Sequence, residues 1–370
     1  MQIEIYNMTV LNDKLNILLE AVCDSFSSLL WDIEYYKCGA FEVYIAASPR
    51  NIEIFQTGRI VGRDDDKEHF GLIESVELET DAEDGDYLII KGRFLMCLLE
   101  RRIIYPTFNF TKLISYSQIT MNVVQHNACT AGIRKIPGLV IGCSSGTCWD
   151  TETKLQVSYD NLMEWVYTIC EKIGGTANIR LSKTNNEQYE MIFELSQGAD
   201  RSILQEENPH IIFSDRYNNL LSFTYFTDTS VKKNYAYVLG KGEGEKRKRT
   251  IYFEGTEPSS LERYEVYVDA KDISDEEQEN GETKPLSEEE YAELLKEKGK
   301  QSIVPITMKS ESQIAVQSTQ FQYGVDYFVG DFVTVEHNRF GIRQNKIQLV
   351  GMIESFDRNG RNLTPTFKED

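Results

Sequence analysis

Residues 72–105 read LIESVELETDAEDGDYLIIKGRFLMCLLERRIIY and predict a long β-hairpin followed by a short buried helix. Leu72, Val76 and Leu78 recur with the two-residue period of a half-buried strand. The dipeptide Asp84-Gly85 is a strong signal for the tight turn that joins two strands. After the second strand, the apolar residues take up helical spacing. A hairpin that leads into one apolar helix indicates a small β-barrel or β-sandwich with a helix packed on it.

The length and composition of the chain limit the classes of protein to which it can belong. It has 370 residues, of which 41% are hydrophobic, so we expect roughly two to four packed domains rather than disorder. The formal charge of −20 argues against tight nucleic-acid binding, because a duplex-binding protein needs a basic face to displace counterions. No apolar run of about 18 residues is present, so no membrane span is expected. The N-terminus lacks the features of a signal peptide, so we expect the protein to stay in the cytoplasm in which it is synthesised, unless lysis or an assembly carries it out.

Capping signals predict two further helices. The first has Ser158 as a candidate N-cap, then an apolar stripe and a closing glycine pair, and covers residues 158–173. The second begins at a capping box that starts with Ser287 and covers residues 287–298. Strand patterns surround both helices, whereas residues 106–157 are interpreted as irregular.

One group of residues has the composition of a zinc site. Seven cysteines without an export signal suggest reduced thiols that act as small hydrophobic residues. Three of these cysteines and one histidine nevertheless form two pairs of metal-binding side chains that could hold a structural zinc. The pairs differ in spacing and an apolar segment separates them, so we favour the interpretation without a metal, and no cofactor is predicted. The four candidates are His126, Cys129, Cys143 and Cys148.

Other local patterns are weak signals for catalysis or binding. The glycine-rich segment 240–244 is followed by a basic run, not by the Gly-Lys-Ser/Thr of a phosphate loop, so a bend between strands is favoured. Asp200 and Asp215 form a possible acid pair, but nothing in the sequence couples them. No histidine stands in a hydrolase arrangement. Three aromatic residues that could bind carbohydrate are interpreted as core and interface residues: Trp31, Tyr35 and Tyr36.

Several short motifs stand at intervals along the whole chain. The first part contains Trp31, Tyr35-Tyr36, Gly39, Phe41-Glu42, Gly58-Arg59, Gly92-Arg93 and Arg101-Arg102. The later part contains Gly198-Ala-Asp200-Arg201-Ser202, Ile211-Ile-Phe213-Ser214, Asn218-Asn219-Leu220, Arg263-Tyr-Glu265, Gly324-Val-Asp326-Tyr327 and Gly330-Asp331. Each motif is short. Together they resemble the siphophage ReqiPepy-type family of tail proteins, which is related to the tail-tip and baseplate hub proteins of long-tailed phages.

The resemblance implies a mostly β, α+β fold of several domains. The first tube-like β-domain, a barrel or sandwich with one short helix, would take residues 1–105 and a returning segment at about 211–240. A smaller α+β domain would take residues 106–210, and a second tube-like domain with one helix residues 241–370. Three chains would then form a ring of six similar units that adapts a sixfold tail tube to threefold symmetry.

The resemblance also implies a function and a location. The chain is expected to be a non-enzymatic structural protein of a phage or prophage-derived tail tip, a baseplate hub that lets DNA pass. Its expected partners are two further copies of itself, the distal tail or tail-tube protein, the tape-measure protein and other tail-tip proteins. Two other classes stay open: a carbohydrate-binding receptor-contact protein and a cell-wall hydrolase. The last predicted strand region reaches almost to Asp370, so we expect no added hydrolase domain.

Overall fold

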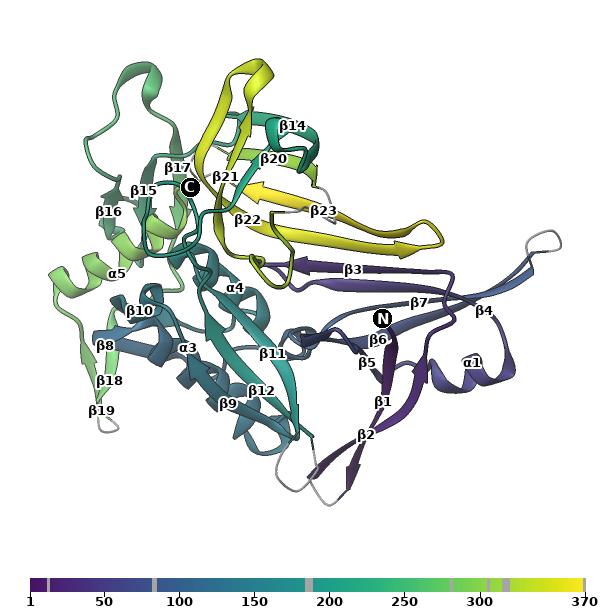
Figure 1. The fold of residues 1–370 in the computed structure, drawn as a ribbon. Helices are drawn as coiled ribbons and strands as arrows, with labels where there is room; N and C mark the ends of the chain where they lie inside the picture. Colours follow the sequence, from purple (N-terminus) through teal and green to yellow (C-terminus); the bar gives the residue numbers. More distant parts are fainter. Residues whose placement is uncertain are drawn as a thin grey trace.

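The computed structural model describes residues 1–11, 14–81, 85–183, 189–279, 282–304, 307–314 and 320–368, and most of this chain is β-structure, as predicted (Figure 1). Thirteen strands form one sheet in the order β14-β20-β23-β22-β3-β4-β7-β6-β5-β1-β2, with β21 on β22 and β13 on β21. Its N-terminal strands are β1 (Ile3–Leu11), β2 (Lys14–Cys23), β3 (Ser28–Glu34), β4 (Ala40–Ala46), β5 (Ile60–Arg63), β6 (Asp66–Asp81) and β7 (Gly85–Phe94). Its later strands are β13 (Ile212–Ser214), β14 (Leu220–Asp228), β20 (Thr307–Ile314), β21 (Phe332–His337), β22 (Ile342–Asp357) and β23 (Gly360–Lys368).

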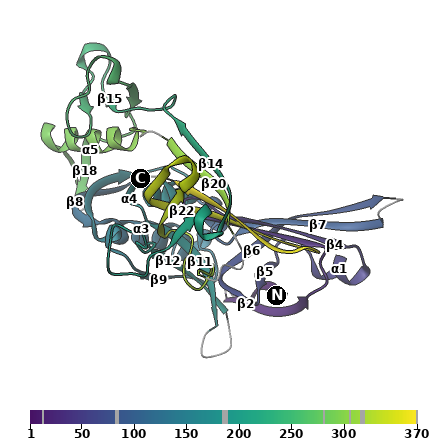
Figure 2. The same cartoon turned by 45° about the horizontal axis from the view of Figure 1, so that its top comes forward.

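The hairpin predicted from residues 72–105 is present as β6 and β7, which pair from Asp81 and Gly85 onward. Leu72 is buried as expected, but the side chain of Leu78 is 57% exposed. The reason is that β5 pairs with β6 only up to Leu72, so the far end of the hairpin extends into solvent, as Figure 2 shows. The helix after β7 is a single turn, α2 (Cys97–Glu100), and a short helix α1 (Pro49–Ile54) follows β4.

The first and last parts of the chain share the large sheet. β3 pairs antiparallel with β22, from Glu34 opposite Gly351 to Leu29 opposite Phe356. The described strands form no closed barrel, because the order of the sheet has two ends, β14 and β2. One apolar core includes buried side chains of both parts, among them fully buried Trp31, and it draws on β3, β4, β7, β21, β22 and β23.

The middle of the chain is an α+β layer below this sheet, and it corrects two sequence interpretations. Residues 106–157 are not irregular but contain strands and the helix α3. The intrinsic helix propensity of a segment such as α3 is low, so its helical structure depends on packing against the rest of the chain. The helix predicted for residues 158–173 begins at Leu162 with Asn161 as N-cap, not at Ser158, because the backbone of residues 159–160 pairs with Ile104 instead. The elements of this layer are β8 (Phe108–Ser115), α3 (Tyr116–Val124), β9 (Leu139–Ser144), β10 (Glu152–Val157), α4 (Leu162–Ile173), β11 (Thr176–Lys183) and β12 (Tyr189–Ser196). β8 pairs with β10, and β12 lies between β11 and β9.

A third unit lies at the upper left of Figure 1 and contains the other predicted helix. α5 (Glu288–Gln301) begins with the predicted capping box between Ser287 and Glu290. It packs on a separate three-stranded sheet rather than on the large one. The strands of this unit are β15 (Tyr235–Leu239), β16 (Arg249–Tyr252) and β17 (Glu265–Asp269), and a hairpin of β18 (Glu276–Glu279) and β19 (Glu282–Pro285) precedes the helix. The predicted division of the chain into domains stays a prediction. In the described part of the chain, no helix has the length and apolarity needed to cross a membrane.

Candidate assembly site

Tyr35, at the end of β3, ties the first part of the chain to the middle layer. Its hydroxyl donates to the carbonyl of Gly174 at the end of α4 (3.2 Å) and accepts from the N–H of Gly198 after β12 (2.9 Å). Burial raises the pKa of this hydroxyl above its ordinary value, so it stays protonated and able to donate. One buried side chain therefore joins three segments that are far apart in sequence.

Asp331, in the last part of the chain, completes this junction. Its carboxylate accepts from the N–H of Ala199 (2.7 Å), from the N–H of Phe328 (3.1 Å) and from Nε of Arg201 (2.8 Å). The residue is only 3% exposed, and hydrogen bonds of this number satisfy a buried carboxylate. The structure thus brings together two of the motifs on which the resemblance was based, 198–202 and 330–331. We call Tyr35, Gly198, Arg201, Gly330 and Asp331 the three-part junction.

Two glycines allow the three-part junction to pack closely. A Cβ on Gly198 would stand 1.9 Å from the carbonyl oxygen of Gly330, which no side chain can occupy without a backbone shift. Gly330 has a φ of +103° and faces the ring of Tyr35, so both its backbone conformation and the space around it favour glycine. The close approach explains why these positions need glycine.

A buried ion network crosses the sheet where β3 pairs with β22. Arg63 on β5 and Glu354 on β22 are each 2% exposed, and Nη1 of Arg63 lies 3.0 Å from Oε1 of Glu354. Asp65 binds Nε of Arg63 at 2.9 Å, and Arg361 on β23 also donates to Glu354. Burial by itself lowers the pKa of Arg63, but the two carboxylates outweigh it and raise the pKa. The first and last parts of the sheet are therefore joined by paired charges as well as by backbone hydrogen bonds.

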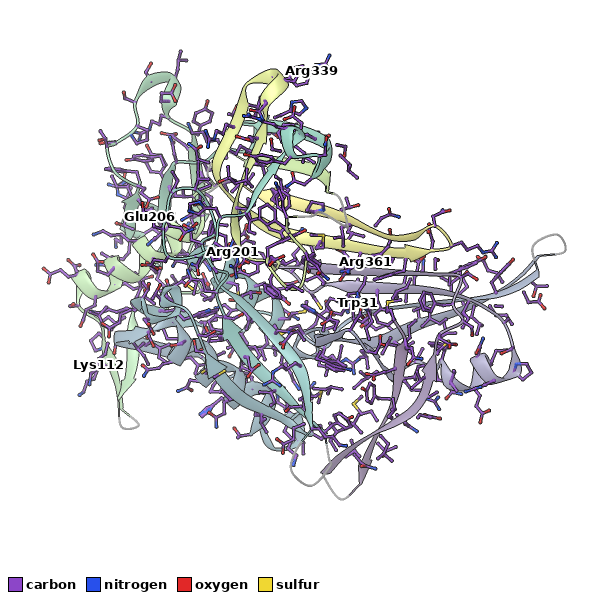
Figure 3. The ribbon with its side chains drawn as sticks, in the orientation of Figure 1. Trp31, Lys112, Arg201, Glu206, Arg339 and Arg361 are labelled. Carbon is purple, nitrogen blue, oxygen red and sulfur yellow. The ribbon has the colours of Figure 1, made fainter. Side chains whose placement is uncertain are left out.

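Trp31 links this network to an Asp–His pair, and Figure 3 labels it together with Arg361 near the centre of the sheet. Nε1 of Trp31 donates to Oδ2 of Asp66 (3.0 Å), and Nδ1 of His69 lies 2.9 Å from the same oxygen. Burial by itself raises the pKa of Asp66, but the contact with His69 outweighs it and the pKa is lowered. Burial by itself lowers the pKa of His69, but the contact with Asp66 outweighs it, so the pKa of His69 is raised.

The Asp66–His69 pair predicts a pH dependence of stability. Because the pKa of folded His69 is raised above the unfolded value of about 6.5, its contribution is fully present below that pH and is lost as the pH rises through the folded pKa. We expect the free energy of unfolding to fall as the pH is raised from about 6 towards 8. Urea unfolding at a series of pH values measures this, and His69→Gln should flatten the slope. An unchanged slope in that variant would contradict the prediction.

The two ends of the large sheet expose apolar side chains. β2 and β14 each have one neighbouring strand among the described residues, and Figures 1 and 2 place them at opposite ends of the sheet. Leu18 on β2 is 58% exposed and Leu221 on β14 is 66% exposed. Further exposed apolar residues on the same two strands are Leu19, Val22 and Phe226. Strand edges with apolar side chains are templates for pairing with another chain.

The four residues considered as zinc ligands are His126, Cys129, Cys143 and Cys148. Among the described residues, no group of three or more His, Cys, Asp or Glu side chains is placed to hold a metal ion. The Sγ of Cys143 donates to Glu194 (3.4 Å). Without a metal, burial raises the pKa of both Cys129 and Cys148 to about 11, so both thiols are protonated at neutral pH.

The other candidate residues also lie apart. Asp200 pairs with Lys346 (2.9 Å), whereas Asp215 accepts from the N–H of Asn338 (2.9 Å), so the two carboxylates serve different contacts. The segment 240–244 leads into β16, as the sequence predicted. Trp31 and Tyr35 are buried and Tyr36 is half-buried, in agreement with their interpretation as core residues.

Sequence reasoning missed the ion network. The available signal was a charged residue, Glu354, inside the apolar run 347–356, since a carboxylate in a buried strand needs a partner. The sequence does not say which of its cations supplies that partner. Arg63 stands 291 positions away.

Comparisons with known proteins place the chain among tail proteins. The model of the family described as Siphovirus ReqiPepy6 Gp37-like protein matches residues 7–367. The fold is similar to three solved structures. The tail protein from Neisseria meningitidis MC58 has a TM-score of 0.58 at 14% identity, with 100% of this chain and 97% of that chain covered. The prophage MuSo2 43 kDa tail protein from Shewanella oneidensis has a TM-score of 0.59 at 11% identity, with 99% of this chain and 98% of that chain covered. The prophage tail protein gp18 from Listeria monocytogenes EGD-e has a TM-score of 0.54 at 11% identity, with 100% of this chain and 95% of that chain covered. No curated protein matches the chain.

Proposed function

Because the chain belongs to the Siphovirus ReqiPepy6 Gp37-like family of phage tail proteins, we propose that it forms the baseplate hub ring at the end of a tail tube. The observation that supports this best is the large sheet with its two open ends, β2 and β14. A sheet with two different free ends can pair head to tail with further copies. Such contacts close into a ring when the rotation between copies fits.

The internal arrangement supports three copies in the ring. Each chain contributes two sets of strands to the sheet. The first set is β1–β7, and the second is β13, β14 and β20–β23. The two sets meet where β3 pairs with β22. Three copies would present six such sets and so adapt a sixfold tube to threefold symmetry. On this proposal the first tube-like domain takes residues 1–105. The second takes part of 241–370 together with β13 and β14, so the segment at about 211–240 joins the second domain instead of the first, to which the sequence prediction assigned it. The middle layer and the α5 unit lie beside them.

The proposed role is structural rather than enzymatic, and its place is the tail tip of the virion. The proposed partners are the distal tail or tail-tube protein, the tape-measure protein and other tail-tip proteins. DNA would pass through the ring. The formal charge of −20 per chain suits this role, because an acidic channel wall repels the phosphate backbone within a Debye length of about 8 Å.

The ring predicts a defined mass and symmetry. We expect mass photometry of the full chain at high concentration, or of the chain with its tail-tube protein, to give three times 42.6 kDa. Negative-stain averages should show threefold rings. Leu18→Glu and Leu221→Glu should each shift the population to monomers, because each places a charge on an apolar edge that pairs with another copy.

A matched control tests whether the edges themselves are responsible. Leu261 is 89% exposed and lies outside β2 and β14, so Leu261→Glu should leave the rings intact. A dimer, an open filament, or equal loss of rings in all three variants would overturn the proposed ring.

A further inference from the structure

The segment 101–149 has a charge pattern opposite to that of the chain. It contains five Lys or Arg residues and no Asp or Glu, although the chain as a whole has 59 acidic residues. The structure gathers three of these cations around one open hollow of about 420 Å³. We call it the arginine hollow, and its lining residues are Glu100, Arg101, Arg102, Ile103, Ile133 and Arg134.

One wall of the arginine hollow is a short extended segment, 102–104, held against the start of α4. The N–H of Leu162 donates to the carbonyl of Arg102 (2.9 Å), and the N–H of Ile104 donates to the carbonyl of Asp160 (2.9 Å). Side chains alternate along an extended segment, so Ile104 is fully buried while Ile103 points outward and is 51% exposed. The apolar surface of Ile103 is thus fixed in place by the backbone.

The opposite wall is the turn 132–134, which the arginines fasten to the same segment. Nε of Arg102 donates to the carbonyl of Arg134, and Nη1 of Arg134 donates to the carbonyl of Tyr105 (3.3 Å). Buried Asn127 accepts from the N–H of Tyr105 (2.8 Å) through Oδ1. Ile133, at the tip of this turn, is completely exposed. The hollow is therefore built before any ligand arrives, with an isoleucine on each wall.

Among the residues that the structure describes, no carboxylate forms a hydrogen bond or ion pair with the three cations of the arginine hollow. No hydrogen bond or ion pair joins the guanidinium of Arg101 to another group in the described part of the chain, and Arg102 bonds only to carbonyls. Burial and the neighbouring arginines lower the pKa of Arg102, the direction expected where positive charges crowd together. The single carboxylate of the lining, Glu100, is bound by Nη2 of Arg93 (2.6 Å). The hollow thus offers positive charge that its one carboxylate, already bound to Arg93, only partly offsets.

We propose that the arginine hollow binds an acidic segment of a neighbouring protein, with a carboxylate on Arg101 and Arg102 and an apolar side chain between Ile103 and Ile133. Guanidinium groups bind carboxylates through paired N–H donors, and an apolar residue beside the carboxylate covers the exposed isoleucines. A peptide segment fits better than duplex DNA, because the surrounding chain is strongly acidic and repels a long polyanion. This inference does not depend on the ring.

Selection from a random peptide library against the full chain tests the proposal. We expect the enriched peptides to contain Asp or Glu next to Leu, Ile, Phe or Val. Arg101→Glu should weaken the binding of such a peptide about tenfold or more, because it turns a charge-assisted hydrogen bond into repulsion. Ile133→Ser should weaken it about threefold, because it removes apolar contact. Both side chains are exposed and neither makes a hydrogen bond or ion pair in the described part of the chain, so both variants should unfold close to the wild-type temperature.

One control variant and two competing ligands test whether binding is specific to the arginine hollow. Arg50→Glu changes the charge by the same amount at another exposed position and should leave peptide binding unchanged. Inorganic phosphate and a short DNA duplex should compete weakly. Enriched peptides without acidic residues, equal binding by Arg101→Glu and wild type, or tighter binding of phosphate or duplex at this hollow would each overturn the proposal.

Discussion

Glu354→Gln is expected to lower the free energy of unfolding by about 3 kcal/mol, because it leaves the buried guanidinium of Arg63 with one carboxylate instead of two. Glutamine keeps the shape of the side chain, so the change isolates the charge. Asp65 still pairs with Arg63, which places the loss at the lower end of the range for broken buried pairs. Urea unfolding followed by tryptophan fluorescence measures it, since the ring centroid of Trp31 lies 5.5 Å from Cζ of Arg63.

A surface pair and a double variant provide the controls. Lys91 and Glu42 form an ion pair at 2.9 Å with both side chains about half exposed, so Glu42→Gln should change the free energy by less than about 1 kcal/mol. Replacing Arg63 and Glu354 together with methionine should cost less than Glu354→Gln, because both buried charges are removed and Asp65, which loses its partner, has a side chain that is 41% exposed. If the double variant is the less stable of the two, the buried charges are not what couples the two parts of the sheet.

Asp331→Ala is expected to destabilise the three-part junction by about 3 kcal/mol. The substitution removes the acceptor of Ala199, Phe328 and Arg201 at a site where water cannot easily replace it. Because the junction joins the last part of the chain to the middle layer, thermal unfolding should also lose cooperativity. Calorimetry would show this as a broadened or split transition.

Asparagine at position 331 separates charge from hydrogen bonding. Asp331→Asn keeps an oxygen that can accept from the N–H of Ala199 but loses the ion pair with Arg201, so its cost should lie between those of wild type and alanine. Asp24→Ala, at an exposed position, should stay within about 0.5 kcal/mol of wild type. A cost for Asp331→Ala as small as that of Asp24→Ala would contradict the role given to this carboxylate.

The sequence alone determined the elements whose signals are local. The capping box of Ser287 and Glu290 predicted the start of α5, and Gly174 predicted the end of α4, because each cap involves residues a few positions apart. The β6–β7 hairpin followed from strand periodicity and an Asp-Gly turn. The same reasoning misplaced the start of α4 and missed α3, where tertiary partners outweigh weak local signals.

Which distant elements meet depends on long-range packing, which local sequence signals do not specify. The backbone of β3 could hydrogen-bond to any strand, and its pairing with β22 is set by the side chains that both strands bury against one core. The network of Arg63 and Glu354, the three-part junction and the arginine hollow all arise from such meetings. Residues far apart in sequence leave no periodic or spacing signal of their contact. The sequence therefore determined α5, the end of α4, the hairpin and the family resemblance. Long-range packing determined the site, because the choice of partner depends on surfaces that exist only after folding.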